Sequence, residues 1–272
     1  VEVAKLLAQQ GHRTLGRLGD MGVPSFAFVN GLALGGGLEV ALNATYRTVD
    51  SSVGAIGLPE VFLGLVPGWG GATLLPHLVG IRNALRLIIE NPLRNNRLID
   101  AATAHRLGVA DAIFSPIRFL EDSLAWADGV LSGRITVRRK NAPDFLERTF
   151  VWPQAIRIAR KSVASKIGRV AKSPFAALDV LEYTRTASRP DSFAREDDIL
   201  SALISGDQFQ ASMYAFNLVQ KHAKKPTGAP APKSAPPSTV VAPVGPVFRL
   251  HFAGLDKIAT DTNTAKLNIL LN

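Results

Sequence analysis

One succession of segments restricts the possible folds most strongly: a short apolar segment, three consecutive glycines and a helix-like segment. Residues 25–29 are apolar and bounded by Pro and Gly, which is typical of a strand buried on both faces. Glycines occupy 35–37, and residues 38–44 have the pattern of a helix. A further strand is predicted at 45–53. Strand, glycine turn, helix and strand in this order favour a layered α/β fold.

The rest of the chain is predicted to be mainly helical. Residues 54–71 indicate a loop rich in glycine and proline, and 110–114 a short strand. The first helix is predicted over 1–20, and the pattern leaves a break at Gly11 open. Further helices are predicted over 72–90, 99–107, 117–131 and 153–170, and over 175–221 with breaks near Pro190 and Gly206.

Composition excludes several classes of protein. With 272 residues, 47% of them hydrophobic, the chain is long enough for one domain with a sizeable core. The absence of cysteine excludes disulfide scaffolds, thiol nucleophiles and Cys-ligated metal sites. No apolar run of about 18 residues occurs, so a soluble, cytoplasmic protein without a transmembrane segment is predicted. No metal is predicted either, because the histidines lack ligand spacing (His12, His222, His251) or read as structural groups (His77, His105).

The net charge of +9 is unevenly distributed. Residues 134–172 contain eleven basic side chains against only Asp144 and Glu147, which makes this segment a candidate anion-facing surface. A solvated helix face is the alternative, and it is favoured for any single side chain. Nucleic acid is not a predicted partner, because the segment lacks interleaved aromatic residues on which bases stack.

The chain divides into three parts by composition. Residues 1–222 form the main predicted domain. Residues 223–246 contain seven of the 17 prolines and read as an extended linker. Residues 247–272 are too few for a core of their own, and they are expected to form strands that pair with the main sheet.

The glycine cluster is the first candidate for chemistry. Consecutive glycines allow positive φ and bring the backbone close to a ligand, and the first turn of the following helix offers N–H groups to a negative oxygen. Tight packing alone is an equally acceptable interpretation. The spacing of Gly31 and 35–37 is neither G-x-G-x-x-G nor a P-loop, and NAD is therefore not predicted.

Two carboxylates in apolar segments are the second candidate. Glu39 follows the glycine cluster by two residues, and Glu60 stands within LPEVFLG. Desolvation raises a carboxyl pKa and suits the group to proton transfer near neutral pH. The alternatives are that Glu39 caps its helix and that Glu60 is a solvated loop residue.

Two long motifs carry a resemblance to a known family. Residues 30–41 read NGLALGGGLEVA and residues 57–71 read GLPEVFLGLVPGWGG, which resembles the double signature of the crotonase or enoyl-CoA hydratase superfamily. The similarity extends over about 1–225 and is strongest to the hydratase part of multifunctional fatty-acid oxidation enzymes, the α subunit of the trifunctional complex, particularly in bacteria. The resemblance implies an α/β fold with a crotonase-like ββα spiral core and a helical C-terminal region.

The resemblance also implies roles for particular residues. The N–H of Gly36 would be one oxyanion-hole donor for the thioester carbonyl, and Glu39 and Glu60 would position water and move its protons. The acyl chain would contact an apolar group comprising Leu65, Val66 and Trp69. The implied activity is syn addition of water to 2-enoyl-CoA. The alternatives are an enoyl-CoA isomerase and a non-catalytic acyl-CoA-binding or scaffolding subunit.

The resemblance implies partners as well. The substrate is an acyl-CoA thioester, coenzyme A is part of that substrate, and NAD is expected only if a dehydrogenase domain lies elsewhere. An oligomer is expected, either a trimer or an assembly with a thiolase subunit. The family's opening strands, which supply the second oxyanion donor, would precede the first residue. The segment 247–272 resembles those strands.

Overall fold

A small parallel sheet lies at the centre of the fold. A computed structural model describes residues 2–168 and 170–223. Strands β1 (Phe26–Val29), β3 (Tyr46–Asp50) and β5 (Ala112–Phe114) are parallel and lie in the order β1-β3-β5. A second parallel pair, β2 (Ala33–Leu34) with β4 (Ile56–Gly57), connects the glycine cluster to the loop that follows β3.

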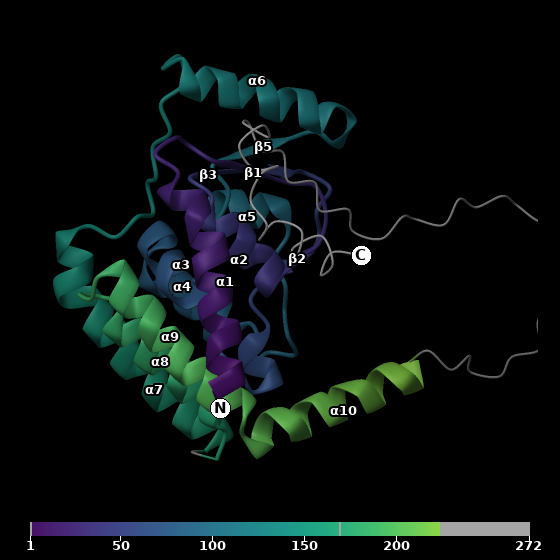
Figure 1. Ribbon diagram of the computed structural model, residues 1–272, viewed down its shortest axis with the longest axis vertical. Helices are drawn as coiled ribbons and strands as arrows, with labels where there is room; N and C mark the ends of the chain where they lie inside the picture. The colour runs from purple at the N-terminus through teal and green to yellow at the C-terminus, as the bar shows by residue number, and fades with distance from the viewer. Residues whose placement is uncertain (1, 169, 224–272) are drawn as a thin grey trace, which may run out of the picture. The chain divides into compact units, whose positions relative to one another are not determined.

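Helices cover both faces of the sheet (Figure 1). Helix α6 (Phe119–Leu131) contacts β1 and β5 on one side. On the other side α2 (Gly36–Asn43) contacts β1, and α5 (Ala101–Leu107) contacts β3 and β5. Asp100 caps α5 by accepting a hydrogen bond from the N–H of Thr103 at 2.8 Å. The predicted α/β layering is confirmed.

The remaining helices form a second layer beside α2. Helices α7, α8 and α9 lie against α3 and α4, and α1 lies along α9 (Figure 1). Their bounds are α1 Glu2–Asp20, α3 Gly71–Val79, α4 Ile81–Leu85, α7 Trp152–Ile167, α8 Lys172–Tyr183, α9 Arg189–Ile204 and α10 Asp207–Ala223. Short 3-10 helices span Glu60–Leu63 and Pro116–Arg118, and π-helical turns span Arg86–Glu90 and Glu147–Val151.

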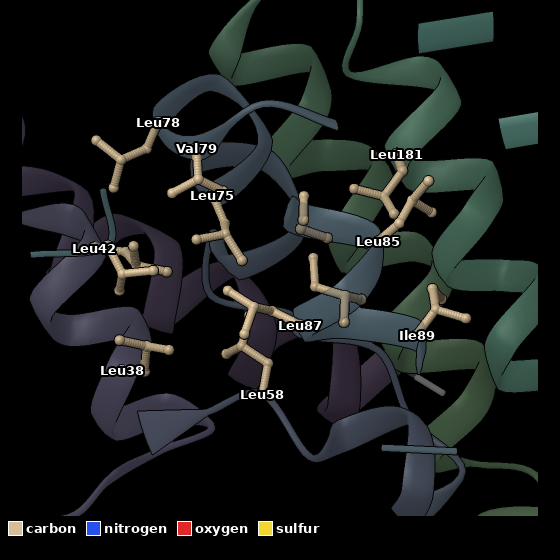
Figure 2. Packing of buried hydrophobic residues seen from close by; sticks show 14 of the residues in the cluster. Leu38, Leu42, Leu58, Leu75, Leu78, Val79, Leu85, Leu87, Ile89 and Leu181 are labelled. Carbon is tan, nitrogen blue, oxygen red and sulfur yellow. The ribbon is translucent and has the colours of Figure 1, made fainter. Parts of the chain in front are cut away.

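Leucines dominate the interface between these layers (Figure 2). Leu38 and Leu42 of α2 lie close to Leu75 of α3, whereas Leu85 and Leu181 approach each other from α4 and α8. Full burial of such a side chain contributes about 1.5–3 kcal/mol. This packing fixes the position of α2, and with it the backbone N–H groups at the start of that helix.

The structure decides the question that the sequence left open at Gly11. Helix α1 runs from Glu2 to Asp20 through Gly11 without a break. The glycine is required by packing, since a Cβ there would lie 2.1 Å from the indole Nε1 of Trp69. A residue that usually weakens helices is therefore retained to admit a large side chain.

Three further predictions meet different outcomes. The predicted helix 72–90 is divided at Gly80, where φ is +79°. Strand β1 is half-buried rather than buried on both faces. The helix breaks predicted near Pro190 and Gly206 are confirmed, since α9 starts with Pro190 in its first turn and α10 begins at Asp207.

The predicted linker at 223–246 and tail at 247–272 lie, apart from Ala223, outside the described residues. No helix among the residues described combines the length and hydropathy needed to cross a membrane.

Candidate active site

The start of α2 exposes backbone N–H groups at a tight glycine turn. Gly35 has φ +55°, a conformation that favours glycine, and its N–H donates to the carbonyl of Gly57 at 3.0 Å. Gly36 is the first residue of the helix, so its N–H has no acceptor within the helix. This N–H is available in the position at which the resemblance expects an oxyanion donor.

Glu39 is held by the turn that precedes α3. Its Oε1 accepts hydrogen bonds from the N–H of Trp69 at 2.7 Å and from the N–H of Gly71 at 2.9 Å. Asn43 connects the same elements, because its side-chain amide donates to the carbonyls of Glu39 and Trp69. Glu39 is only 3% exposed. No side-chain hydrogen bond caps α2, and the carboxyl group of Glu39, in the first turn of that helix, bonds to the turn before α3 instead.

Glu60 begins the 3-10 helix and approaches the same helix start. Its Oε1 lies 2.9 Å from the position that a Cβ on Gly35 would take. Its Oε2 is buried and has no hydrogen-bond partner among the residues described. Glu60 is half-buried as a residue, but its carboxyl end is enclosed, so it is not a solvated loop residue.

The pKa values of both carboxyl groups are raised. Burial, followed by the negative charge of Glu196, raises the pKa of Glu39 to about 7, against the opposing effect of its two amide hydrogen bonds. Burial, followed by the charge of Glu39, raises the pKa of Glu60 well above its ordinary value. Both carboxyl groups therefore hold a proton more readily than an exposed glutamate does, and Glu39 is partly ionised at neutral pH.

The site contains charged residues that sequence reasoning missed. Glu196 of α9 is fully buried and reaches Gly70, within the turn that binds Glu39. His12 of α1 lies between Glu196 and Asp197. The separations of 184 and 185 residues left no local signal for this contact. The sequence offered one indication that Glu196 is buried. It lies four residues from both Ser192 and Leu200, and therefore on the same face of α9 as these two residues.

The predicted acyl-contact residues lie near this centre in different environments. Val66 is fully buried in the hydrophobic core, and Leu65 is half-buried against it. The Trp69 ring occupies space between Gly11 and Gly36, and a Cβ on Gly36 would lie 3.0 Å from its Cζ3. The contribution of these three residues to acyl binding stays a prediction.

The basic segment is partly neutralised by ion pairs. Arg160 contacts Asp179 and Glu182 at 2.6 and 2.8 Å, and Arg139 contacts Asp111 at 3.1 Å. A separate cavity of about 520 Å³ is lined by residues that include Arg82 and Lys140, but by neither catalytic candidate. The contribution of this segment to anion binding stays a prediction.

Solved structures share the fold. An enoyl-CoA hydratase/isomerase from Pseudoalteromonas atlantica has a TM-score of 0.50 and 22% identity, with 76% of this chain and 66% of that chain covered. An enoyl-CoA hydratase from Mycobacterium avium subsp. paratuberculosis has a TM-score of 0.50 and 18% identity, with 77% and 70% covered. The fold is therefore that of a crotonase-like α/β protein.

Residues 3–150 match the family described as enoyl-CoA hydratase/isomerase. The chain belongs to the enoyl-CoA hydratase/isomerase family. Curated relatives include the fatty acid oxidation complex subunit alpha of Idiomarina loihiensis, 32% identical over 75% of this chain, and that of Pseudomonas syringae pv. tomato, 35% identical over 64%. The chain spans 28% and 24% of the length of these relatives.

Proposed function

We propose that this chain is an enoyl-CoA hydratase domain that adds water to 2-enoyl-CoA thioesters in fatty-acid β-oxidation. Membership of the family supports the reaction class, and relatives named as fatty acid oxidation complex subunits support the pathway. The observation that carries the proposal is the pair of buried carboxyl groups, Glu39 and Glu60, near the start of α2, with the pKa of each raised by burial.

The two carboxyl groups divide the proton transfers. Ionised Glu39 is the base: it takes a proton from water while the water oxygen bonds to C3 of the enoyl group. Protonated Glu60 is the acid: it gives its proton to C2 as the double bond becomes single. Water is thereby added as OH and H on one face of the substrate. One proton enters Glu39 and one leaves Glu60, and proton exchange restores the starting state.

The backbone stabilises the charge that develops during this addition. The electron pair of the double bond moves toward the thioester carbonyl, whose oxygen becomes negative. The N–H of Gly36 donates a hydrogen bond to that oxygen. A preorganised donor of this kind contributes about 10²–10³ in kcat. Leu65, Val66 and Trp69 would line the acyl side of the site.

The experiment is the loss of enoyl-thioester absorbance when the full chain is mixed with a short 2-enoyl-CoA. Loss that disappears in Glu39→Gln and in Glu60→Gln supports hydration by this pair. Binding of an acyl-CoA without turnover would instead indicate a non-catalytic subunit. Conversion of 3-enoyl-CoA to 2-enoyl-CoA without hydration would indicate an isomerase.

Assembly and location are part of the proposal. The relatives are named as subunits of a complex, which supports a multi-subunit assembly for this chain too. A thiolase subunit is the proposed partner, and the cytoplasm is the proposed location. Light scattering of the purified chain, alone and mixed with a thiolase subunit, tests the assembly through the mass of the particle.

A further inference from the structure

A third buried carboxylate lies behind the turn that binds Glu39. Glu196 is 0% exposed and receives three donors from separate parts of the chain. The N–H of Gly70 donates at 2.8 Å, the hydroxyl of Thr73 at 2.5 Å, and Nε2 of His12 lies at 3.1 Å. The Gly70 N–H and the Thr73 hydroxyl both donate and a carboxylate only accepts, so these contacts suit a carboxylate at Glu196.

His12 complements this charge from α1. Its Nδ1 lies 2.7 Å from Asp197 and its Nε2 faces Glu196, so both ring nitrogens meet carboxylate oxygens. Only the protonated ring donates from both nitrogens. Phe193 stacks on the ring with centroids 4.2 Å apart, and Arg189 lies over Phe193 at 5.0 Å. His12 is therefore held in one orientation.

The Trp69–Gly71 turn divides its N–H groups between two carboxylates. The N–H groups of Trp69 and Gly71 donate to Glu39, whereas the N–H of Gly70 between them donates to Glu196. Gly70 has φ +101°, which glycine tolerates and most residues do not. Glu39 and Glu196 thus hold opposite sides of one turn, and a movement of either changes the position of the other.

We propose that Glu196 and His12 are positioning residues for the reaction: they hold the turn that binds Glu39, and their opposite charges set how readily Glu39 takes up a proton. This inference rests on the proposed function, because it assigns Glu39 the role of base. Neither residue touches the substrate, since Glu196 acts through the N–H of Gly70 and His12 acts through Glu196.

The charges around Glu39 support this reading. After burial, the charge of Glu196 is the largest influence raising the pKa of Glu39, and the charge of His12 lowers it. Glu60 also faces Glu39, and Asp197 faces His12. Burial lowers the pKa of His12, but hydrogen bonds and charges of Glu196 and Asp197 outweigh this and raise it.

The test is a titration of the Glu39 carboxyl carbon by NMR in the full chain labelled with ¹³C-glutamate. The Glu39 signal is assigned by its loss in Glu39→Gln. Glu196→Gln removes a negative charge and should move the midpoint down by about one pH unit. His12→Gln removes a positive charge and should move it up by a comparable amount. Residues that served only to stabilise the fold would not produce shifts of opposite sign.

Asp198→Asn is the matched control. Asp198 also lies on α9 and also bridges to α1, through Lys5 at 2.5 Å, but on the exposed surface. This variant should leave the Glu39 midpoint unchanged. The proposal is overturned if Glu196→Gln and His12→Gln shift the midpoint in the same direction or leave it unmoved. If Glu196→Gln does not fold, His12→Gln decides alone, because only an upward shift supports the proposal.

Hydration kinetics separate this inference from the proposed function. The acid limb of the pH profile of kcat/KM should shift with the NMR midpoint in each variant, while the KM for a short 2-enoyl-CoA changes less than kcat. Absence of hydration in every form, wild type included, would refute the proposed function. The signs of the NMR shifts would still decide whether this pair controls Glu39.

Discussion

Glu39 and Glu60 carry identical carboxyl groups, but the protein surrounds the two groups differently. Glu39 accepts two backbone N–H groups from one turn and lies near the negative charge of Glu196. Glu60 lies against Gly35 with a buried oxygen that has no partner in the described part of the chain. Donors favour the ionised carboxylate, and an enclosed site without donors favours the neutral acid. The proposed division of roles, with Glu39 as the base and Glu60 as the acid, rests on this difference in surroundings.

Replacing each glutamate by glutamine tests this difference most severely. Glutamine keeps the shape of the side chain but cannot exchange a proton at neutral pH. Each variant should lose about 10²–10⁴ in kcat, the usual contribution of a general acid or base. The measurement is enoyl-thioester absorbance under saturating substrate. Near-normal turnover in either variant would remove that residue from the mechanism.

Two glycine substitutions each place a Cβ against one of the two carboxyl groups, and the Cβ on Gly71 would also lie 2.7 Å from the Cβ of Pro67. A Cβ on Gly71 would lie 2.8 Å from Oε1 of Glu39, and a Cβ on Gly35 would lie 2.9 Å from Oε1 of Glu60. Gly71→Ala and Gly35→Ala should each reduce kcat by about 10²-fold, since small displacements of reacting groups have effects of that size. The measurement is kcat with circular dichroism as the check on folding.

Gly54→Ala is the control for these variants, because a Cβ at Gly54 meets nothing within 4 Å. It should retain wild-type turnover. Equal losses in all three alanine variants would show that the effect is general destabilisation rather than displacement of a carboxyl group.

The pH profile distinguishes the base from the acid. Glu39 must be ionised to act, so kcat/KM should fall by about tenfold per pH unit below its pKa of about 7. Glu60 must be protonated to act as the proposed acid, so activity should also fall as the pH rises through its raised pKa. A rate that rises as the pH falls below neutrality would reverse the two assignments.

The stability of the folded chain should depend on pH through Glu39. The folded pKa of Glu39 is about 7 against an ordinary value of 4.5, so the folded state binds more protons between these values. The contribution of Glu39 to the free energy of unfolding should therefore be fully present below pH 4.5 and be lost as the pH rises toward 7, by at most about 1.4 kcal/mol per pH unit for one proton. Urea unfolding measures it, and Glu39→Gln should reduce the slope. An unchanged slope in that variant would contradict the raised pKa.

Much of the architecture follows from local patterns in the sequence. The strand at 25–29, the glycine turn and the helix after it are recognisable because each depends on residues next to one another. The helix breaks near Pro190 and Gly206 are predictable for the same reason. The sequence left a break at Gly11 open, because helix propensity describes an isolated segment, whereas here a distant indole excludes a side chain at this position.

The sequence by itself determined the fold class and the two candidate glutamates, because motifs of neighbouring residues carry that information. Only the tertiary structure decided how each glutamate is held. The turn at Trp69–Gly71, Glu196 of α9 and His12 of α1 come together from distant parts of the chain. Proton affinity depends on burial and on charges nearby in space, and no spacing along the chain specifies either.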